Sequence, residues 1–164
     1  MFDFDMNLEK VVGDTIALRA IYRDYAQSIV SRIEHGHGIV GHDVDQFDTA
    51  RDMAVRFTLE NYKPEWAETL QLLLGGGDII PPIPAGAETL DTALSICCEE
   101  YHKDALEIVV KHCVDFQHPF RPNRFLSIMD DTGDAFYEPL REGIKKQQEA
   151  KILSDAAYMK ARLG

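Results

Sequence analysis

Apolar residues recur at three- and four-residue steps along most of the chain, a spacing that places them on one face of an α-helix. From about 7 to 35 this spacing predicts a helical region, which Gly13, Asp14 and Thr15 divide into a short first helix and a longer second one. Gly36 is expected to end the region, because glycine readily adopts the left-handed conformation that follows many helices. An acidic, glycine-containing loop is predicted from 37 to 47.

The same spacing predicts helical pairs in the rest of the chain. Asp48 or Thr49 is expected to cap a helix over about 50–61, and Pro64 separates it from a second helix over 64–74. A Gly- and Pro-rich loop follows at 75–87, and the next pair is predicted at 92–100 and 103–112. Weaker patterns predict helices at about 124–131 and 135–150, with a polar helix at the end. No strand-like alternation stands out, so the predicted class is all-α.

A helix–turn–helix unit followed by an irregular loop recurs along the chain, which is typical of stacked repeats. Two short helices cannot bury both of their apolar faces alone, so each pair needs a neighbouring pair. We therefore expect one domain, residues 1–164, built as a helical solenoid. Its expected parts are capping helices with an acidic loop (1–47), two repeats (48–91 and 92–123) and a repeat-like pair with a polar helix (124–164).

Residues 92–115, TALSICCEEYHKDALEIVVKHCVD, resemble an ankyrin repeat without a gap. The stretch from Thr92 to Ser95 stands where Thr-Pro-Leu-His opens such a repeat, and Cys97 and Cys98 take the place of two small residues. The resemblance implies a stack of repeats that functions by binding another protein. Tyr101 and Cys113 replace the turn glycines of the family. A left-handed conformation at such residues costs about 1–2 kcal/mol, so these turns are either strained or shaped differently.

The charge of the chain restricts its possible partners. There are 28 acidic residues against 17 Lys and Arg, and the net charge is −11. The first 120 residues hold 21 acidic and nine basic residues, whereas the last 44 hold seven and eight. This balance argues against direct binding to nucleic acid or to an anionic membrane. The acidic start and the odd count of three cysteines favour a reduced, cytoplasmic chain without a leader peptide or membrane span.

A protein-binding role fits the charge and the aromatic residues. Aromatic side chains beside acids make good binding hot spots, and Trp66, directly after Pro64, is the expected anchor. The predicted partner-binding residues are Asp43, Asp45, Asp48, Tyr62, Glu65, Trp66, Glu99, Glu100 and Tyr101. We expect no cofactor and no enzymatic activity. The expected partner is a basic protein such as a toxin, a nuclease or a nucleic-acid-binding protein, covered by an immunity-like or nucleic-acid-mimicking surface.

Two alternative functions remain open from the sequence. His35, His37 and His42 lie close to several aspartates and would suit a divalent metal or a small active site. The competing interpretation is a loose acidic loop. Cys98 and His102 stand four residues apart on a predicted helix, although cysteine at that position is more typical of a packed core. The other alternative is a scaffold or assembly subunit, in which the ends of the solenoid pair.

Overall fold

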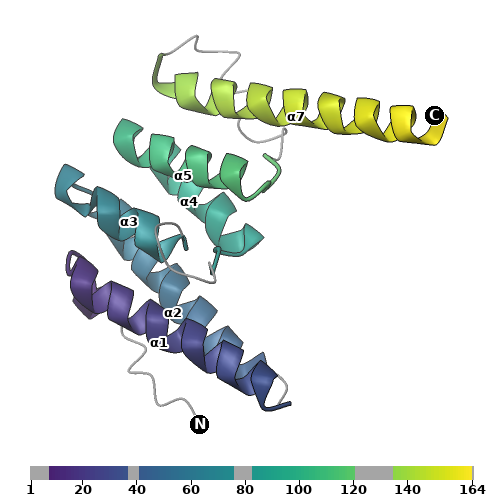
Figure 1. Cartoon of the computed structure of the whole chain (residues 1–164). Helices are drawn as coiled ribbons and strands as arrows, with labels where there is room; N and C mark the ends of the chain where they lie inside the picture. Colours follow the sequence, from purple (N-terminus) through teal and green to yellow (C-terminus); the bar gives the residue numbers. More distant parts are fainter. Residues whose placement is uncertain (1–7, 37–40, 76–82, 121–134, 164) are drawn as a thin grey trace. The chain divides into compact units, whose positions relative to one another are not determined.

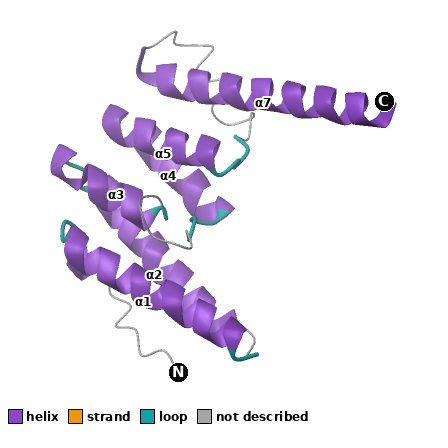
Figure 2. Cartoon of the chain, viewed as in Figure 1, coloured by secondary structure: helices purple, strands orange, loops and turns teal. Residues whose placement is uncertain are grey.

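The structure is a computed structural model that describes residues 8–36, 41–75, 83–120 and 135–163. Every regular element in these residues is helical, which confirms the all-α class (Figure 2). The α-helices are α1 (Thr15–Glu34), α2 (Gly41–Glu60), α3 (Ala67–Leu73), α4 (Ala87–Glu99), α5 (Lys103–Asp115) and α7 (Glu138–Leu163). Short 3-10 helices are η1 (Leu8–Val11), η2 (Pro64–Trp66) and η3 (Ala135–Tyr137).

The chain forms two compact units, Met1–Val109 (unit 1) and Val110–Gly164 (unit 2), and the boundary lies inside α5. In unit 1, α1 packs on α3 and α2 packs on α4, so alternate helices share a layer (Figure 1). The hydroxyl of Tyr22 in α1 donates to the carbonyl of Leu73 in α3 at 2.8 Å, and Arg19 pairs with Glu68 at 2.6 Å. The most deeply buried side chains of unit 1 include Leu18, Tyr22, Phe47, Leu59, Leu70, Leu73, Leu90 and Leu94.

Several local predictions are confirmed. The predicted division at Gly13 and Asp14 is present, since Gly13 has a positive φ of 92°; Asp14 in addition caps α1, accepting a hydrogen bond from the amide of Ala17 at 3.0 Å. Gly36, at φ 73°, follows the last residues of α1. The break before Pro64 is also present, because Lys63 adopts an extended conformation that the proline ring imposes on its neighbour.

The predicted loop at 37–47 is wrong from Gly41 onward, because α2 already begins there and is not capped by Asp48 or Thr49. The physical reason is Phe47, whose side chain is fully buried. Its ring stacks on Tyr25 at 4.0 Å and meets Tyr22 edge-on at 5.2 Å. This packing holds the helix together ahead of the expected start, in a stretch whose composition is typical of a loop.

The helix predicted from Thr92 also begins earlier, at Ala87. Leu90 is buried, and the hydroxyl of Thr89 donates to Asp52 in α2 at 3.1 Å, so tertiary contacts stabilise the extra turn. Thr92 therefore lies in the second turn of α4 and does not open the helix.

Of the two replaced turn glycines, Tyr101 has the expected left-handed conformation, with φ 59°. Cys113 does not, because α5 continues to Asp115 and buries Cys113 completely. The left-handed residue after α5 is Gln117, with φ 56°. The amide of His118 donates to the carbonyl of Cys113 at 2.8 Å, which closes this helix end.

Unit 2 consists of the end of α5, the segment to Phe120, η3 and α7. The buried residues include Val110, Cys113, Phe136, Tyr137 and Leu140. At Gly143 an added Cβ would lie 2.5 Å from Val110, so the glycine permits α7 to approach α5 closely. α7 is one continuous helix to Leu163, and the predicted separation near 150 is absent. The helix predicted at 124–131 lies outside the described residues.

Candidate functional site

The turn between α2 and α3 positions the only tryptophan. Pro64 opens η2, and the indole of Trp66 lies 6.0 Å from the ring of Phe57, measured between centroids. The ammonium of Lys63 lies 4.7 Å from the indole centroid, a cation–π contact. An added Cβ on Gly13 would lie 3.1 Å from the indole nitrogen, so the glycine leaves space for the ring at the entry of α1.

The turn between α4 and α5 places Tyr101 outward. Its left-handed conformation ends α4, and the amide of His102 donates to the carbonyl of Cys97 at 3.1 Å. These features constitute a Schellman motif with tyrosine at the position that glycine usually occupies. The side chain of Tyr101 is 56% exposed. The backbone thus carries strain while the ring remains largely in solvent.

The two turns meet through an aromatic contact. The ring of Tyr62 lies 5.4 Å from that of His102, between centroids. The pKa of Tyr62 is raised by burial of its hydroxyl, and then by the negative charges of Asp104 and Cys97. The hydroxyl oxygen is buried and makes no hydrogen bond in the structure. Tyr62 therefore serves as the apolar link between the α2–α3 turn and the α4–α5 turn.

We name the surface formed by these two turns the turn edge. Its residues are Phe57, Tyr62, Glu65, Trp66, Glu99, Glu100 and Tyr101. The three glutamates are exposed, and Phe57 is 38% exposed. Aromatic rings flanked by carboxylates suit the guanidinium group of arginine, which stacks on rings and donates paired hydrogen bonds to carboxylates. Six of the nine predicted partner-binding residues lie here, and only Phe57 is an addition.

The other three predicted partner-binding residues lie elsewhere on α2. Asp48 accepts a hydrogen bond from Arg51 at 2.7 Å and is about 18 Å along the helix from Glu60, given a rise of about 1.5 Å per residue. The side chains of Asp43 and Asp45 lie outside the described residues. The structure therefore does not place Asp48 on the turn edge.

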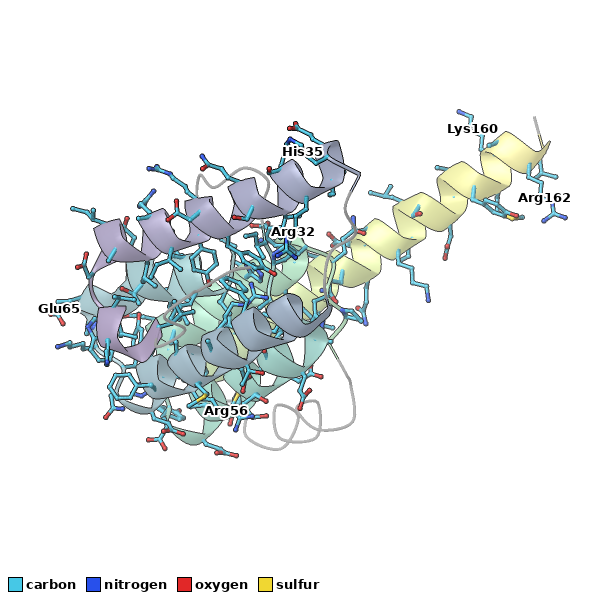
Figure 3. The ribbon with its side chains drawn as sticks, turned by 90° about the horizontal axis from the view of Figure 1, so that it is seen from below. Arg32, His35, Arg56, Glu65, Lys160 and Arg162 are labelled. Carbon is cyan, nitrogen blue, oxygen red and sulfur yellow. The ribbon has the colours of Figure 1, made fainter. Side chains whose placement is uncertain are left out.

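Of the three histidines in the predicted metal cluster, His35 is the one whose side chain the structure describes. Its side chain is exposed, and Nδ1 lies 2.7 Å from the carbonyl oxygen of Ser31. Figure 3 shows His35 and Glu65 at opposite ends of unit 1. His37 and the side chain of His42 lie outside the described residues. Within the described residues, no three His, Cys, Asp or Glu side chains form a group that could hold a metal ion.

The cysteines of α4 and α5 belong to the interior. Cys97 and Cys113 are buried, and Cys98 is half-buried. Burial, and then the charge of Glu99, raises the pKa of Cys98 to about 11. The thiolate is the nucleophilic form of cysteine, so Cys98 is a poor nucleophile at neutral pH and its packing role accounts for its position.

Two residues were missed by sequence reasoning. Phe57 was not singled out in the sequence; it lies at the edge of the buried face of α2 and is partly in solvent. The side chain of Arg51 is only 3% exposed, and it donates hydrogen bonds to the carbonyl oxygens of Ile83 and Pro84, which are more than 30 residues away in sequence. No local signal in the sequence marks that contact, since an arginine three residues after an aspartate usually forms an exposed ion pair on the surface of a helix.

Comparisons of the chain with protein-family models, with curated proteins and with solved structures find no match. In the described part of the chain, no helix combines the length and the apolar character needed to cross a membrane.

Proposed function

We propose that this chain is a protein-binding module and that its turn edge covers a basic surface of a partner protein. The observation that carries the proposal is Tyr101, which is 56% exposed beside Glu99 and Glu100 and is held in a left-handed conformation. A glycine at that position would relieve the strain. More than half of this large ring is nevertheless open to solvent at the end of α4, where a partner protein can contact it.

The chemistry of the turn edge favours an arginine-rich surface as the target. Trp66 and Tyr101 offer rings, and Glu65, Glu99 and Glu100 offer carboxylates. Exposed ion pairs contribute little affinity by themselves, typically less than about 1 kcal/mol each. The rings would supply the apolar contact, while the net charge of −12 over residues 1–120 would steer a basic partner into place. Two forms of this function are proposed: an immunity-like protein that binds a toxin, and an inhibitor whose carboxylates mimic the phosphates of a nucleic acid.

We infer a stacked, ankyrin-like arrangement as the framework. Packing of α1 on α3 and of α2 on α4 supports it, because stacked helical hairpins bring alternate helices together. The resemblance of residues 92–115 supports it as well, although α4 begins five residues before Thr92. In such a stack the hairpin turns lie along one edge, and a partner can contact several of them at once.

The test begins with affinity capture of the native partner, followed by titration of the purified pair at rising salt. The Glu99→Lys/Glu100→Lys variant is expected to weaken binding by at least about tenfold at low salt. Lysines near the C-terminus of α4 suit the helix dipole, so folding is expected to be retained. Asp24→Lys/Glu34→Lys in α1 makes the same change in charge away from the turn edge and is the matched control. Equal effects of both variants would contradict the assignment.

Tyr101→Gly separates binding from folding. Because it removes the strain of a left-handed tyrosine, it is expected to stabilise unit 1 by about 1 kcal/mol. It should also weaken partner binding by at least about tenfold, as expected for an aromatic hot spot. A stabilised variant that still binds with unchanged affinity would remove Tyr101 from the interface and overturn the proposal.

A further inference from the structure

The helix α7 has two halves with different surroundings. In the first half, Leu140 and Gly143 are buried, and Ile144 and Gln147 are partly buried. These four residues define the packing face of α7. In the second half, every residue from 148 to 163 is exposed. At about 1.5 Å per residue this free stretch is about 24 Å long.

The free stretch is not uniformly polar. Leu153 (71% exposed) and Tyr158 (62%) lie on other sides of the helix, whereas three large apolar side chains share one side: Ile152 (67%), Met159 (53%) and Leu163 (81%). With Ala156 they follow a spacing of four, three and four residues, which is the seam of a two-heptad coiled coil. We name Ile152, Ala156, Met159 and Leu163 the seam.

The seam does not continue the packing face. At about 100° per residue, its mean direction is rotated by about 140° around the helix axis from the packing face. On the side that continues the packing face, the free stretch carries Lys151, Ser154 and Arg162 together with Tyr158, whose ring ends in a hydroxyl. If this stretch were merely an overhang of the packed helix, a second apolar seam on another side would have no explanation. The seam therefore indicates a contact that unit 2 itself does not provide.

We propose that the occupant is the same stretch of a second copy, so that two α7 ends pair in antiparallel orientation. One register places Ile152 opposite Leu163 of the second copy and Ala156 opposite Met159 of the second copy. Small residues then face large ones in the two central layers, which fills the space between the helices. A two-fold axis repeats each contact, as an isologous dimer requires.

The charges beside the seam are complementary in this register. Asp155 lies next to the seam and comes beside Arg162 of the second copy, and the two-fold axis repeats the pair. In the single chain Arg162 instead donates to the hydroxyl of Tyr158 at 3.2 Å, on the side away from the seam, so pairing requires this exposed side chain to turn towards Asp155 of the second copy. Figure 3 shows Arg162 and Lys160 on the free stretch of α7. A parallel pair would instead bring Asp155 beside Lys160, and would oppose two alanines at position 156, which leaves a gap.

Two heptads give a small interface, so the dimer is expected to be weak and to depend on concentration. Sedimentation equilibrium of the full chain from micromolar to millimolar concentration measures it directly. Ile152→Glu/Met159→Glu is expected to raise the dissociation constant at least about 100-fold, because Met159 lies in both central layers and Ile152 in both outer ones, so every layer gains a charge. Ser154→Glu/Ala161→Glu adds the same charge on the opposite side of the helix and is the matched control. Circular dichroism checks that both variants keep their helix.

Charge exchange tests the orientation. Asp155→Arg and Arg162→Asp each place like charges in contact, and each is expected to weaken self-association by about tenfold. An equimolar mixture of the two variants restores both opposite-charge pairs, so it is expected to associate as the original chain does. If Asp155→Arg is rescued by Lys160→Asp instead, the antiparallel pair is wrong. A chain that stays monomeric at millimolar concentration, or that is weakened equally by the control variant, overturns the proposal.

Discussion

Units 1 and 2 each hold a proline-containing segment with one long polar side chain from a helix, but the two side chains differ in charge. In unit 1, Arg51 donates to the carbonyl oxygens of Ile83 at 2.6 Å and Pro84 at 3.3 Å. In unit 2, Gln147 donates to the carbonyl oxygen of His118 at 2.6 Å and accepts from the amide of Phe120 at 3.3 Å. The buried cation and the neutral amide thus each bind the backbone of a proline-containing segment to a helix.

The difference lies in what each side chain requires from its surroundings. Arg51 is 3% exposed, so its charge needs a partner, which Asp48 provides at 2.7 Å, and the ring of Phe47 lies 5.2 Å below the guanidinium. Gln147 is only half-buried and needs no counter-charge. Hydrogen bonds that involve a charge are stronger, but the penalty for burying that charge is larger as well. The arginine is therefore harder to replace than the glutamine.

A glycine accompanies each of these contacts. Gly75, at φ 91°, lies so close to Ile83 that an added Cβ would be 2.0 Å from its backbone oxygen. Gly143 admits Val110 and Phe120, whose side chains would be 2.5 and 3.2 Å from an added Cβ. The neighbour of Gly75 is backbone, whereas those of Gly143 are side chains. Side chains can shift more easily than backbone. Replacement of Gly75 in unit 1 by a larger residue is therefore expected to be more destabilising than replacement of Gly143 in unit 2.

The largest effect is expected for Gly75→Ala. A left-handed alanine and a collision with backbone that Arg51 holds in place should destabilise unit 1 by about 3 kcal/mol or more. Urea denaturation monitored by circular dichroism measures the loss, and hydrogen exchange locates it. Gly86→Ala is the matched control, since an added Cβ there meets nothing within 4 Å and φ is −72°. Equal losses for the two variants would show that the close approach is unimportant.

Arg51→Met tests the buried cation itself. The variant keeps most of the side-chain volume and loses the charged hydrogen bonds, so a loss of about 2–3 kcal/mol is expected. Asp48 is half exposed and can be hydrated after the change, which limits the damage. Faster amide exchange at Ala85, whose amide donates to Leu74, should accompany the loss. Unchanged exchange at this amide would mean that Arg51 does not hold the segment.

Gln147→Ala is the corresponding change in unit 2, and a smaller loss of about 1–2 kcal/mol is expected. The reason is that the glutamine is neutral and its partners are partly exposed. Exchange at Phe120 should increase, because its amide loses its acceptor. Gln148→Ala removes the exposed neighbour and is the control. A loss equal to that of Arg51→Met would contradict the ranking by charge and burial.

The smallest effect concerns Tyr22, whose hydroxyl lies under α3 close to Arg51. Burial raises the pKa of Tyr22 well above 10, and the nearby charge of Arg51 only partly offsets this. The folded chain keeps a proton that the unfolded chain loses above about pH 10, so stability is lost as the pH rises through that value. Tyr22→Phe should be less stable by about 1 kcal/mol at pH 7 but should lose less between pH 9 and 11.

The control for this pH dependence is Tyr158→Phe, because Tyr158 is 62% exposed. Its pH profile, measured by urea denaturation, should match that of the original chain. If Tyr22→Phe also leaves the alkaline slope unchanged, the buried hydroxyl does not contribute to it.

Local signals in the sequence predicted the helix boundaries that depend on a single residue. Asp14, Gly36 and Pro64 act through their own backbone or side chain, so their effects survive in any context. The starts of α2 and α4 were missed because Phe47 and Leu90 determine them by packing against residues distant in sequence. Packing of this kind has no signature in a short window.

The candidate site was predictable in the same limited sense. Tyr62, Trp66 and Tyr101 were recognisable as aromatic residues in turns, because prolines and helix ends mark turns in a sequence. That Tyr62 and His102 bring the two turns together required the structure, since 40 residues separate them. The role of Arg51 was hidden for the same reason.

The chain contains a single tryptophan, and it lies within the turn edge, between Phe57 and Lys63. Its fluorescence is therefore an intrinsic optical reporter for that surface. Emission wavelength and quenching by iodide or acrylamide would follow the occupation of this surface without any attached dye. Spectral changes on adding a ligand would thus be attributable to one known indole.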